Sequence, residues 1–231
     1  MKSLGDRIKE YENASTHKLL KKTPVLIRVD GKAFHTYCRN FDKPFDKILM
    51  KAMNTAAFYV ATEIQGFKVA YIQSDEVTFA LTDYDNIETD AWFNYKISKI
   101  VSISASIMTA RFNRIIQEEK PNLPLAYFDS RAFNVPKEDV VNAFLWRAHD
   151  WERNSLQMYA RKFFSHKQLM NKNKQDIHEM LHAIKKNWAE DLTPQEKNGT
   201  FLIKKENDYI SRYDIKPNFM DLQLNFGELF L

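Results

Sequence analysis

The chain has 231 residues, 44% of them hydrophobic and 13% aromatic, which is enough apolar material for one large domain or a core domain with an appendage. Five glycines and seven prolines are too few for a low-complexity or disordered chain. A net charge of +4 is compatible with a polyanionic partner without requiring one, and a single cysteine, Cys38, excludes an intrachain disulfide and a cysteine metal cluster.

The first fifteen residues are charged and lack the apolar segment of a secretory signal. No stretch approaches the roughly 18 apolar residues that a membrane span needs. We therefore expect a soluble, cytoplasmic protein with no membrane partner, in keeping with the lone cysteine.

Four strands and three helices are predicted in the first 136 residues. In chain order they are a charged helix over 4–20, a buried strand over 24–29 that stops at Asp30, a helix over 44–64, strands over 67–72 and 77–81 around a break at 73–76, a helix over 92–118 and a strand over 125–133. The last of these helices carries polar side chains on one stripe, among them Lys96, Lys99 and Asn113.

After the first helix, the element order is β-α-β-β-α-β, which predicts an α+β fold of ferredoxin-like, split βαβ type. In that arrangement one antiparallel sheet carries both helices on one face. From residue 137 the pattern becomes helical, over 139–164 and 175–186, followed by a turn at Asn198-Gly199 and a strand over 200–203. We expect residues 1–136 to form the core, and 137–231 to be a helical C-terminal part packed on it, not an independent domain.

Two acids occupy informative places in this sheet. Asp30 follows the first strand directly, and Asp75 lies in the break between the second and third strands. In the predicted strand order these strands are central neighbours in the sheet, so the two acids at their ends can lie side by side. Two close carboxylates raise each other's pKa, and a divalent cation removes the conflict. Mg²⁺ prefers hard oxygen ligands, and a pair of such ions can activate an attacking oxygen and stabilise a leaving pyrophosphate.

The stretch after Asp30 suits a triphosphate. Gly31 allows a sharp turn, and successive amides there can form an anion-binding nest. Lys32 or Lys43 can neutralise phosphate charge, and His35 can donate to a phosphate oxygen. Taken singly, an Asp-Gly after a strand or a Ser-Asp-Glu hairpin is more often a plain turn with solvated acids. The agreement of two acids at adjacent strand ends favours the functional interpretation.

Several motifs together resemble the tRNA-histidine guanylyltransferase superfamily. They are Arg28-Val29-Asp30-Gly31-Lys32-Ala33-Phe34-His35, Asn40-Phe41-Asp42-Lys43-Pro44-Phe45-Asp46, Gln73-Ser74-Asp75-Glu76-Val77-Thr78-Phe79, Phe128-Asp129-Ser130-Arg131, Trp146-Arg147-Ala148-His149-Asp150 and Asn198-Gly199-Thr200. The match runs from about residue 4 to about residue 205, and the set is specific although each piece alone is not.

The resemblance implies a polymerase-like palm that adds nucleotides to a 5′ end in the 3′-to-5′ direction. A 5′-monophosphate RNA end is first adenylylated with ATP, and the 3′-hydroxyl of an incoming nucleoside triphosphate then attacks the activated 5′ phosphorus. The implied cofactors are two Mg²⁺ ions with ATP or GTP as activating and incoming nucleotides. The implied partners are tRNA and further copies of the chain in a homotetramer.

The resemblance also implies residue roles. Asp30, Asp75 and Lys43 would be catalytic, and Asp30, the Gly31 carbonyl and Asp75 would hold the metals. The nucleotide contacts would be Asp30, Gly31, Lys32, Ala33, Phe34, His35, Lys43, Asp46, Ser74 and Asp75. Contacts to RNA or phosphate would come from Lys96, Lys99, Arg131, Arg147 and Asn154, on a surface with further basic residues at Arg153, Arg161, Lys162, Lys167 and Lys172.

One departure from the family pattern favours a branch within it. Eukaryotic members carry a His-Ile-Asn-Asn run after the Trp-Arg motif, and this chain has Glu152-Arg153-Asn154-Ser155, with only the first asparagine in common. This favours the guanylyltransferase-like branch, which rebuilds truncated tRNA 5′ ends by copying the opposite strand, over strict guanylate addition to histidine tRNA.

Two other classes of protein share parts of this pattern. A palm-fold nucleotide cyclase has the same acids and sheet but needs neither a basic helical part nor RNA. A non-catalytic RNA-binding module would keep the fold, but it has no need of unpaired carboxylates beside phosphates. Phosphoryl transfer depends on positioning and charge neutralisation, so no nucleophilic side chain is required and we expect no catalytic role for Cys38.

Overall fold

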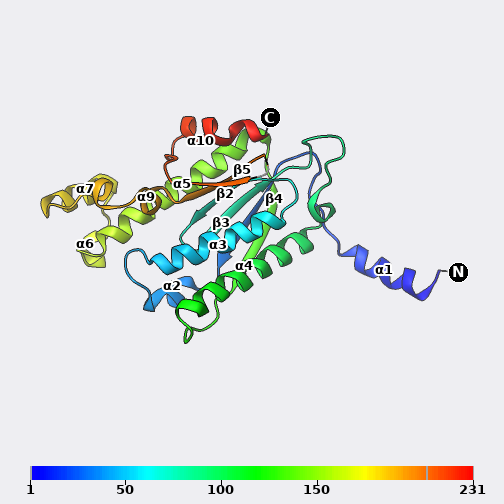
Figure 1. Ribbon diagram of the computed structural model, residues 1–231, viewed down its shortest axis with the longest axis horizontal. Helices are drawn as coiled ribbons and strands as arrows, with labels where there is room; N and C mark the ends of the chain where they lie inside the picture. The colour runs from blue at the N-terminus through cyan, green and yellow to red at the C-terminus, as the bar shows by residue number, and fades with distance from the viewer. Residues whose placement is uncertain (1, 207, 231) are drawn as a thin grey trace.

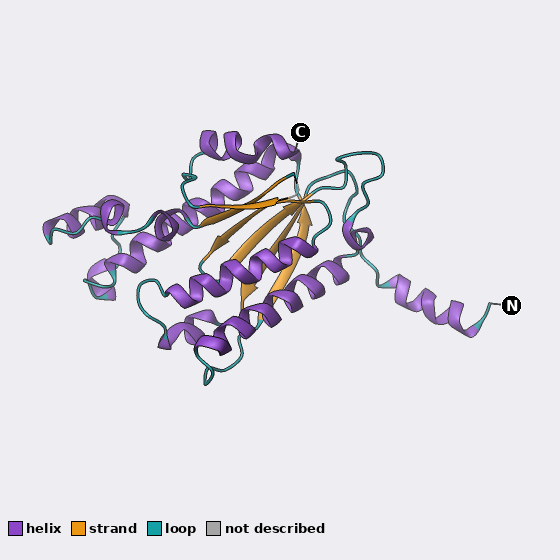
Figure 2. Ribbon diagram, in the orientation of Figure 1, coloured by secondary structure: helices purple, strands orange, loops and turns teal. Residues whose placement is uncertain are grey.

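A six-stranded antiparallel sheet lies at the centre of the molecule, with helices on both of its faces (Figure 2). The computed structural model describes residues 2–206 and 208–230. In chain order, the elements up to the fourth strand are α1 (Leu4–Ala14), β1 (Val25–Gly31), α2 (Phe34–Tyr37), η1 (Cys38–Asn40), α3 (Lys47–Glu63), β2 (Phe67–Gln73), β3 (Glu76–Leu81), η2 (Trp92–Tyr95), α4 (Ile97–Glu119) and β4 (Phe128–Asn134).

The C-terminal part contributes both helices and strands. Its elements are α5 (Lys137–Ala160), α6 (His166–Leu169), α7 (Lys174–Ala183), α8 (Trp188–Asp191), α9 (Pro194–Asn198), β5 (Thr200–Lys205), β6 (Asp208–Arg212), α10 (Phe219–Phe226) and η3 (Gly227–Phe230). The predicted strand over 200–203 is present as β5, and the strand at 208–212 is an addition that the sequence did not indicate.

The sheet order is β4-β1-β3-β2-β5-β6. The first four strands have the order of the split βαβ arrangement, which confirms the predicted α+β fold, and the two C-terminal strands lengthen the sheet beyond β2. The break between β2 and β3 is a hairpin in which Gln73 pairs with Glu76, leaving Ser74 and Asp75 as its two central residues. Ser74 adopts φ 47°, the left-handed value that a tight hairpin turn requires at this position.

Helices α3 and α4 lie side by side on one face of the sheet (Figure 1). Their apolar residues and alternate residues of β1, β2 and β3 form one buried cluster, which includes Ile27, Met53, Phe79 and Phe112. The other set of alternate residues, such as Leu26 and Ala80, packs against α5 and α10. Both predicted helices therefore cover one face, and the C-terminal helices cover the other. The division of the chain at residue 136 stays a prediction.

The N-terminal helix is shorter than the predicted 4–20. Its start is fixed by a capping box between Ser3 and Asp6, and it ends at Ala14. The backbone beyond it is held by tertiary hydrogen bonds, in which Leu20 N–H donates to the Asn134 side chain and Lys22 N–H donates to the Asp83 carboxylate. Helix α1 extends away from the rest of the molecule (Figure 1), and none of its residues is buried.

The predicted helix over 92–118 is divided. A 3-10 turn at Trp92–Tyr95 precedes α4, and the positive φ values of Phe93, Asn94 and Tyr95 break the helical path between them. Asn113, predicted on the polar stripe, is buried instead, because its amide group exchanges hydrogen bonds with the backbone of Ala126. Within the described residues, no helix combines the length and hydropathy needed to cross a membrane.

Candidate active site

Asp30 and Asp75 meet at one end of the sheet. Asp30 is the penultimate residue of β1 and pairs with Glu76, the first residue of β3. The N–H of Gly31 donates to the carbonyl oxygen of Asp75 over 3.1 Å, so the end of β1 is bonded to the β2–β3 turn. The predicted strand order thus brings the two acids together, as the sequence led us to expect.

Four carboxylates make this end of the sheet acidic. Asp129 on β4, Asp30 on β1 and Glu76 on β3 are register partners in one row, and Asp75 adjoins the row in the turn. Burial, followed by the charges of Glu76 and Asp129, raises the pKa of Asp30, while Arg131 opposes the rise. Burial also raises the pKa of Asp75 to about 6; the Ser74 hydroxyl, 2.8 Å away, opposes this and the charge of Asp30 adds to it. A nearby cation would oppose these rises in pKa.

A cavity of about 710 Å³ opens beside Asp75 and extends between α2, α3 and α5. This volume lies within the range of small-molecule and cofactor sites. The cavity wall is largely apolar, with Phe34, Met53 and Trp151 among its residues. Gln73 also lines it, and the Oε1 atom of Gln73 is buried without a hydrogen-bond partner in the described residues. An unpaired buried acceptor in an apolar wall suits the amino group of a nucleobase.

Six of the predicted nucleotide-binding residues line this cavity: Phe34, His35, Lys43, Asp46, Ser74 and Asp75. The Asp46 carboxylate caps α3 by accepting from the N–H groups of Ile48 and Leu49, and its second oxygen accepts from Asp42 N–H. Lys43 Nζ donates to the Cys38 carbonyl over 2.9 Å. Asp46 therefore holds the loop, and this loop places the positive charge of Lys43 at the cavity.

The other four predicted nucleotide-binding residues adjoin the cavity at the β1–α2 junction. The amides of Gly31 and Lys32 already donate to the carbonyls of Asp75 and Tyr127. Ala33 is left-handed at φ 56°, and it starts the four-residue helix α2. The first amides of a helix have no acceptor within it, so α2 itself leaves the amides of residues 33–35 unused, and their contact with a phosphate stays a prediction.

Gly31 is required for a reason that the sequence did not reveal. We expected it to make a sharp turn, but it is the last residue of β1, and the left-handed turn is made by Ala33. A Cβ atom at position 31 would lie 2.2 Å from the ring of Phe34. The absence of a side chain therefore lets the buried Phe34 ring pack against the strand end, where it meets Phe112 and Phe128.

The donor set at the strand ends suits a metal ion that substrate phosphates help to bind. Among the residues described, no three acidic, histidine or cysteine side chains converge on one point. Asp30 and Asp75 are the two carboxylates in question; burial raises both pKa values, with the charges of Glu76 and Asp129 adding to it at Asp30 and the charge of Asp30 adding to it at Asp75. Mg²⁺ is commonly held by one or two carboxylates together with phosphate oxygens and water. Asp30 and Asp75 fit that pattern, and the metal site stays a prediction.

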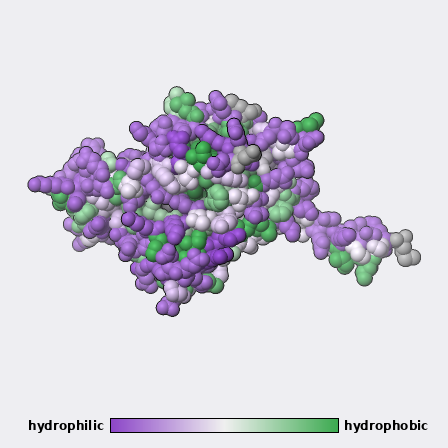
Figure 3. Space-filling view, in the orientation of Figure 1, coloured by the Kyte–Doolittle hydropathy of each residue, from purple (hydrophilic) through white to green (hydrophobic). Residues whose placement is uncertain are grey.

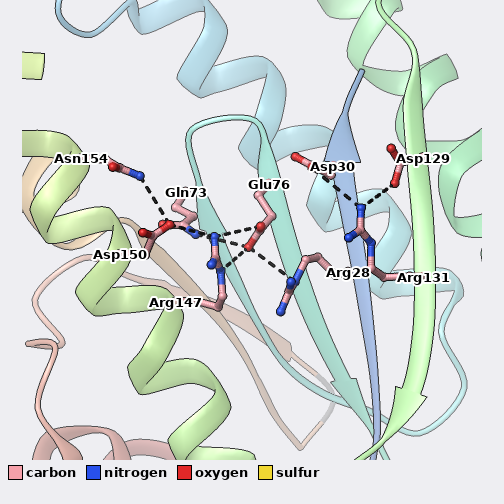
Figure 4. Close-up of polar contacts among 9 residues, drawn as sticks. All are labelled: Arg28, Asp30, Gln73, Glu76, Asp129, Arg131, Arg147, Asp150 and Asn154. Carbon is pink, nitrogen blue, oxygen red and sulfur yellow. Dashed lines mark hydrogen bonds and ion pairs between the residues drawn. The ribbon is translucent and has the colours of Figure 1, made fainter. Parts of the chain in front are cut away.

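Arg147 is placed differently from the exposed RNA contact that the sequence suggested. Its guanidinium makes a two-point contact with Glu76, at 2.7 and 2.9 Å, and a further bond of 3.1 Å with Asp150 (Figure 4). Its side chain is only 11% exposed. The Glu76 carboxylate thus fixes Arg147 between the sheet and α5, and Arg28 approaches the same carboxylate to 3.8 Å. Asn154, by contrast, is exposed and bonded weakly to Asp150.

The other predicted RNA contacts lie in two different places. Arg131 is near the acids, 4.0 Å from Asp30 and 3.1 Å from Asp129, and is 53% exposed. Lys96 and Lys99 are at the start of α4, next to the segment that leads into β1. That segment enters the sheet at the end opposite Asp30, so these lysines are not phosphate ligands at the carboxylates.

Several cavity residues were not predicted as nucleotide contacts. The C-terminal part supplies Trp151, Met158, Arg161, Lys162, Gln195, Gly199 and Thr200. Arg161 and Lys162 were expected on an RNA surface, and here they line the nucleotide-sized cavity. Gly199 has φ 74°, and a Cβ there would come within 2.8 Å of the Ile72 carbonyl, which explains the glycine of the Asn198-Gly199-Thr200 motif. Cys38 also lines the cavity, and burial raises the pKa of its thiol to about 11.

Comparison with known proteins decides the family. The sequence model described as tRNAHis guanylyltransferase matches residues 5–136, more than half of the chain. The chain belongs to the tRNAHis guanylyltransferase family. This confirms the resemblance drawn from the motifs, and members of the family are nucleotidyltransferases.

Similar structures and relatives extend the likeness to the whole chain. A bacterial tRNA(His) guanylyltransferase (Thg1)-like protein in complex with ATP has a TM-score of 0.91 and 39% identity, covering 99% of both chains. Such a protein in complex with GTP has a TM-score of 0.84 and 35% identity over 99% of both chains. The tRNA(His) guanylyltransferase of Schizosaccharomyces pombe is 34% identical over 67% of this chain, and the match spans 59% of that protein's length.

The segment that departs from the eukaryotic family pattern has structural contacts of its own. Glu152 pairs with Lys174 at 2.7 Å, and Arg153 pairs with Asp150. Ser155 is fully buried, donates to the Glu196 carbonyl over 2.7 Å and accepts from the indole N–H of Trp188. Glu152 and Ser155 thus join α5 to α7, α8 and α9, whereas Arg153 and Asn154 are exposed and contact only Asp150 of their own helix among the described residues.

Proposed function

We propose that this protein adds nucleotides to the 5′ end of tRNA in the 3′-to-5′ direction, and that it copies the opposite strand to repair truncated 5′ ends. The observation that carries the proposal is the meeting of Asp30 and Asp75 beside a nucleotide-sized cavity. Its support is the full-length likeness to bacterial Thg1-like proteins in complex with ATP and with GTP.

The reaction has two transfers. In the first, an oxygen of the RNA 5′-monophosphate attacks the α-phosphorus of ATP; a P–O bond forms, pyrophosphate leaves and the RNA end is adenylylated. In the second, the 3′-hydroxyl of an incoming nucleoside triphosphate attacks the RNA 5′ phosphorus. The new phosphodiester bond displaces AMP, and the hydroxyl proton passes to solvent. Neither transfer needs a covalent bond to the protein.

The roles of the residues follow from their surroundings. Asp30 and Asp75 supply the negative charge that binds metal, with the Gly31 carbonyl as a third oxygen. Lys43 and Lys32 compensate phosphate charge, His35 donates to a phosphate oxygen, and the first amides of α2 donate to the triphosphate. Asp46 positions the loop that carries Lys43. Arg161 and Lys162 add positive charge from α5 and the turn after it.

Two Mg²⁺ ions complete the proposed site. When bound between the carboxylates and the phosphates, such ions polarise the reacting oxygens and offset the charge that develops on the leaving group. The chain's own contribution is to hold Asp30 and Asp75 at adjacent strand ends and to exclude water through the apolar walls of the cavity. In the absence of a cation, burial in this arrangement raises the pKa values of both acids.

The contacts of residues 152–155 favour repair over strict guanylate addition. If this segment recognised a particular tRNA feature directly, its side chains would be expected at the surface. Glu152 and Ser155 are engaged within the protein instead, and the two exposed residues, Arg153 and Asn154, both contact Asp150 of the same helix. Discrimination between incoming nucleotides then falls to base pairing with the template. Strict guanylate addition to histidine tRNA remains the alternative outcome of the test.

We further propose that the active form is a homotetramer in the cytoplasm, and that residues 137–231 act as an extension of the core. The apolar side of α1 supports self-association. Leu4, Ile8 and Tyr11 are 68%, 47% and 68% exposed and lie one helical turn apart. Figure 3 shows apolar side chains gathered along one edge of this projecting helix.

The deciding experiment supplies Mg²⁺, ATP and labelled nucleoside triphosphates with two 5′-monophosphate tRNAs that lack their first nucleotide. One carries C at the opposing 3′-side position and the other carries A. Incorporation of G into the first and U into the second supports templated repair. Addition of G to histidine tRNA alone, whatever the opposing base, supports strict guanylate addition. Consumption of triphosphate without RNA points to a cyclase, and binding without incorporation contradicts the catalytic proposal.

A further inference from the structure

Trp146 on α5 is an unusual surface residue. The chain has four tryptophans, and Trp92, Trp151 and Trp188 are 6%, 4% and 9% exposed. Trp146 is 57% exposed. An exposed indole costs free energy in water unless something covers it. Its immediate neighbour Arg147 is held between the sheet and α5, so the indole is attached to a rigid position.

Two arginines lie against the indole of Trp146. The guanidinium carbon of Arg147 is 4.6 Å from the ring centroid, and that of Arg28 is 5.0 Å from it. Both guanidiniums approach the same Glu76 oxygen, at 2.7 and 3.8 Å, and both side chains are nearly buried. Cations that share one carboxylate oxygen lie next to each other. The two guanidiniums therefore lie close together against the indole, which leaves the exposed part of the ring open to another planar group.

This arrangement makes the ring a fixed platform. Cation–π contacts hold the indole in place, and the Glu76 carboxylate fixes the cations. The buried Arg28 Nε has no hydrogen-bond partner of its own in the described residues, so the indole is one of its few attractive contacts. Cations beneath an aromatic ring also withdraw electron density from it, which favours stacking of another planar, electron-rich ring on the open side.

The platform lies within reach of the acids. Arg28 precedes Asp30 by two residues on β1, which corresponds to roughly 7 Å along a strand. Arg131 is the register partner of Arg28 on β4, and its guanidinium is 4.0 Å from Asp30. The indole contacts Arg28, and Figure 4 shows Arg28 on the strand next to Arg131, whose guanidinium approaches Asp30.

We propose that Trp146 stacks on the terminal nucleobase of the RNA strand that is extended, so that the 5′ phosphate of that nucleotide meets Arg131 and lies beside Asp30. This rests on the proposed function, whose RNA substrate it places on the α5 side of the sheet, across the strand ends from the nucleotide cavity. Stacking on an aromatic ring accepts every base, as an enzyme that copies a template requires. Trp146 is then a positioning residue for the RNA end, and Arg28 and Arg147 position Trp146.

The test compares three substitutions at one site. Trp146→Ala removes the ring, Trp146→Phe keeps an aromatic ring, and Trp146→Leu keeps apolar bulk without one. Phe219→Ala on the neighbouring helix α10 is the matched control, because Phe219 is a 42% exposed aromatic side chain outside the group around Glu76. The probe is a short RNA hairpin with a 5′-monophosphate and 2-aminopurine as its terminal base. Three quantities are measured: quenching of the probe, the RNA concentration for half-maximal nucleotide addition, and the dissociation constant for ATP.

The expected results separate stacking from packing. Wild-type protein quenches 2-aminopurine, and Trp146→Ala and Trp146→Leu lose the quenching and raise the half-maximal RNA concentration by about tenfold. Trp146→Phe keeps most of the quenching and a half-maximal RNA concentration near that of wild type. Phe219→Ala changes neither of these quantities, and the dissociation constant for ATP is the same in all variants. Equal behaviour of the Leu and Phe variants, or an unaltered RNA requirement in Trp146→Ala, overturns the inference. Quenching that depends on Trp146 in a protein that adds no nucleotide upholds it and contradicts the proposed function instead.

Discussion

The backbone N–H of Gly31 donates to the carbonyl oxygen of Asp75, and this bond joins two acidic strand ends that are distant in sequence. Asp30 immediately precedes Gly31, so a single hydrogen bond fixes the backbone next to both carboxylates. Their separation is thereby set by the sheet and not by flexible side chains. A site built on strand ends keeps its geometry in the absence of substrate.

Replacement of either acid should abolish nucleotide addition without unfolding the protein. The variants Asp30→Asn and Asp75→Asn keep the size of the side chain but lose its charge. We therefore expect the rate of nucleotide addition to fall by about 10³-fold or more. Binding of the RNA hairpin should be retained. The control is Asp129→Asn, which changes a neighbouring acid of the same row that is 62% exposed. Full activity in Asp75→Asn would exclude the proposed metal site.

The response of stability to pH should reveal the Asp75 carboxyl. Its folded-state pKa is about 6 against a usual value of 3.8, so its contribution to the free energy of unfolding is full below about pH 4 and is lost as the pH rises through 6. Mg²⁺ needs the ionised form. Addition of Mg²⁺ should therefore raise the melting temperature above pH 6 and have little effect near pH 4.5. Scanning fluorimetry with Asp75→Asn, which lacks the titrating group, is the control; an identical Mg²⁺ effect in that variant would contradict the assignment.

The buried contact between Arg147 and Glu76 should matter for stability more than for RNA affinity. Removing one partner leaves the other charge buried and unpaired, which typically costs about 3–5 kcal/mol. Arg147→Ala should therefore lower the melting temperature by roughly 6–20 °C. The double variant Glu76→Gln with Arg147→Met should recover part of this loss, because neither charge is left. Because Arg147 also supports Trp146, some weakening of RNA binding is expected; unchanged stability together with a larger loss of RNA binding than in Trp146→Ala would restore the direct contact suggested by the sequence.

The sequence predicted the relationship of Asp30 and Asp75 because it depends on local patterns. A strand that ends in an acid, a two-residue hairpin around another acid and the β-α-β-β-α-β order together determine which strand ends are adjacent. The helix over 92–118 was placed correctly in the chain, but its break was missed. Three residues with positive φ, Phe93 to Tyr95, produce that break, and none is a glycine that would have indicated it.

Features that depend on distant partners were not predictable from local patterns. Arg147 resembled a surface residue because Glu76, which buries it, lies 71 positions away. The role of Gly31 depends on the position of the Phe34 ring, which in turn is set by Phe112 and Phe128. The strand over 208–212 has weak periodicity of its own and forms by pairing with β5. In each case the tertiary contact, and not the residue's own propensity, decides the outcome.

Gly31→Ala should be damaging although alanine fits an extended backbone. The added Cβ would lie 2.2 Å from the Phe34 ring, and that ring is 3% exposed and packed between other aromatic side chains. Overpacking of this kind costs about 1–3 kcal/mol, and it displaces the strand end that carries Asp30. We expect a lower melting temperature and a larger loss of nucleotide addition. Gly5→Ala, whose Cβ meets only Ser3 at 3.8 Å, is the matched control and should change neither quantity.

Disruption of the apolar side of α1 should change the oligomeric state. Leu4, Ile8 and Tyr11 lie on one face of a helix that buries no residue of its own, so Ile8→Asp places a charge in the centre of that face without disturbing the core. If these side chains contact another copy of the chain, light scattering after size exclusion should show a smaller mass for Ile8→Asp than for wild type. The control Asn13→Asp adds the same charge to the opposite side of α1 and should keep the wild-type mass. If the wild-type protein has the mass of a single chain, the proposed tetramer is contradicted. If wild type is an oligomer and Ile8→Asp has the same mass, the interface lies on another surface.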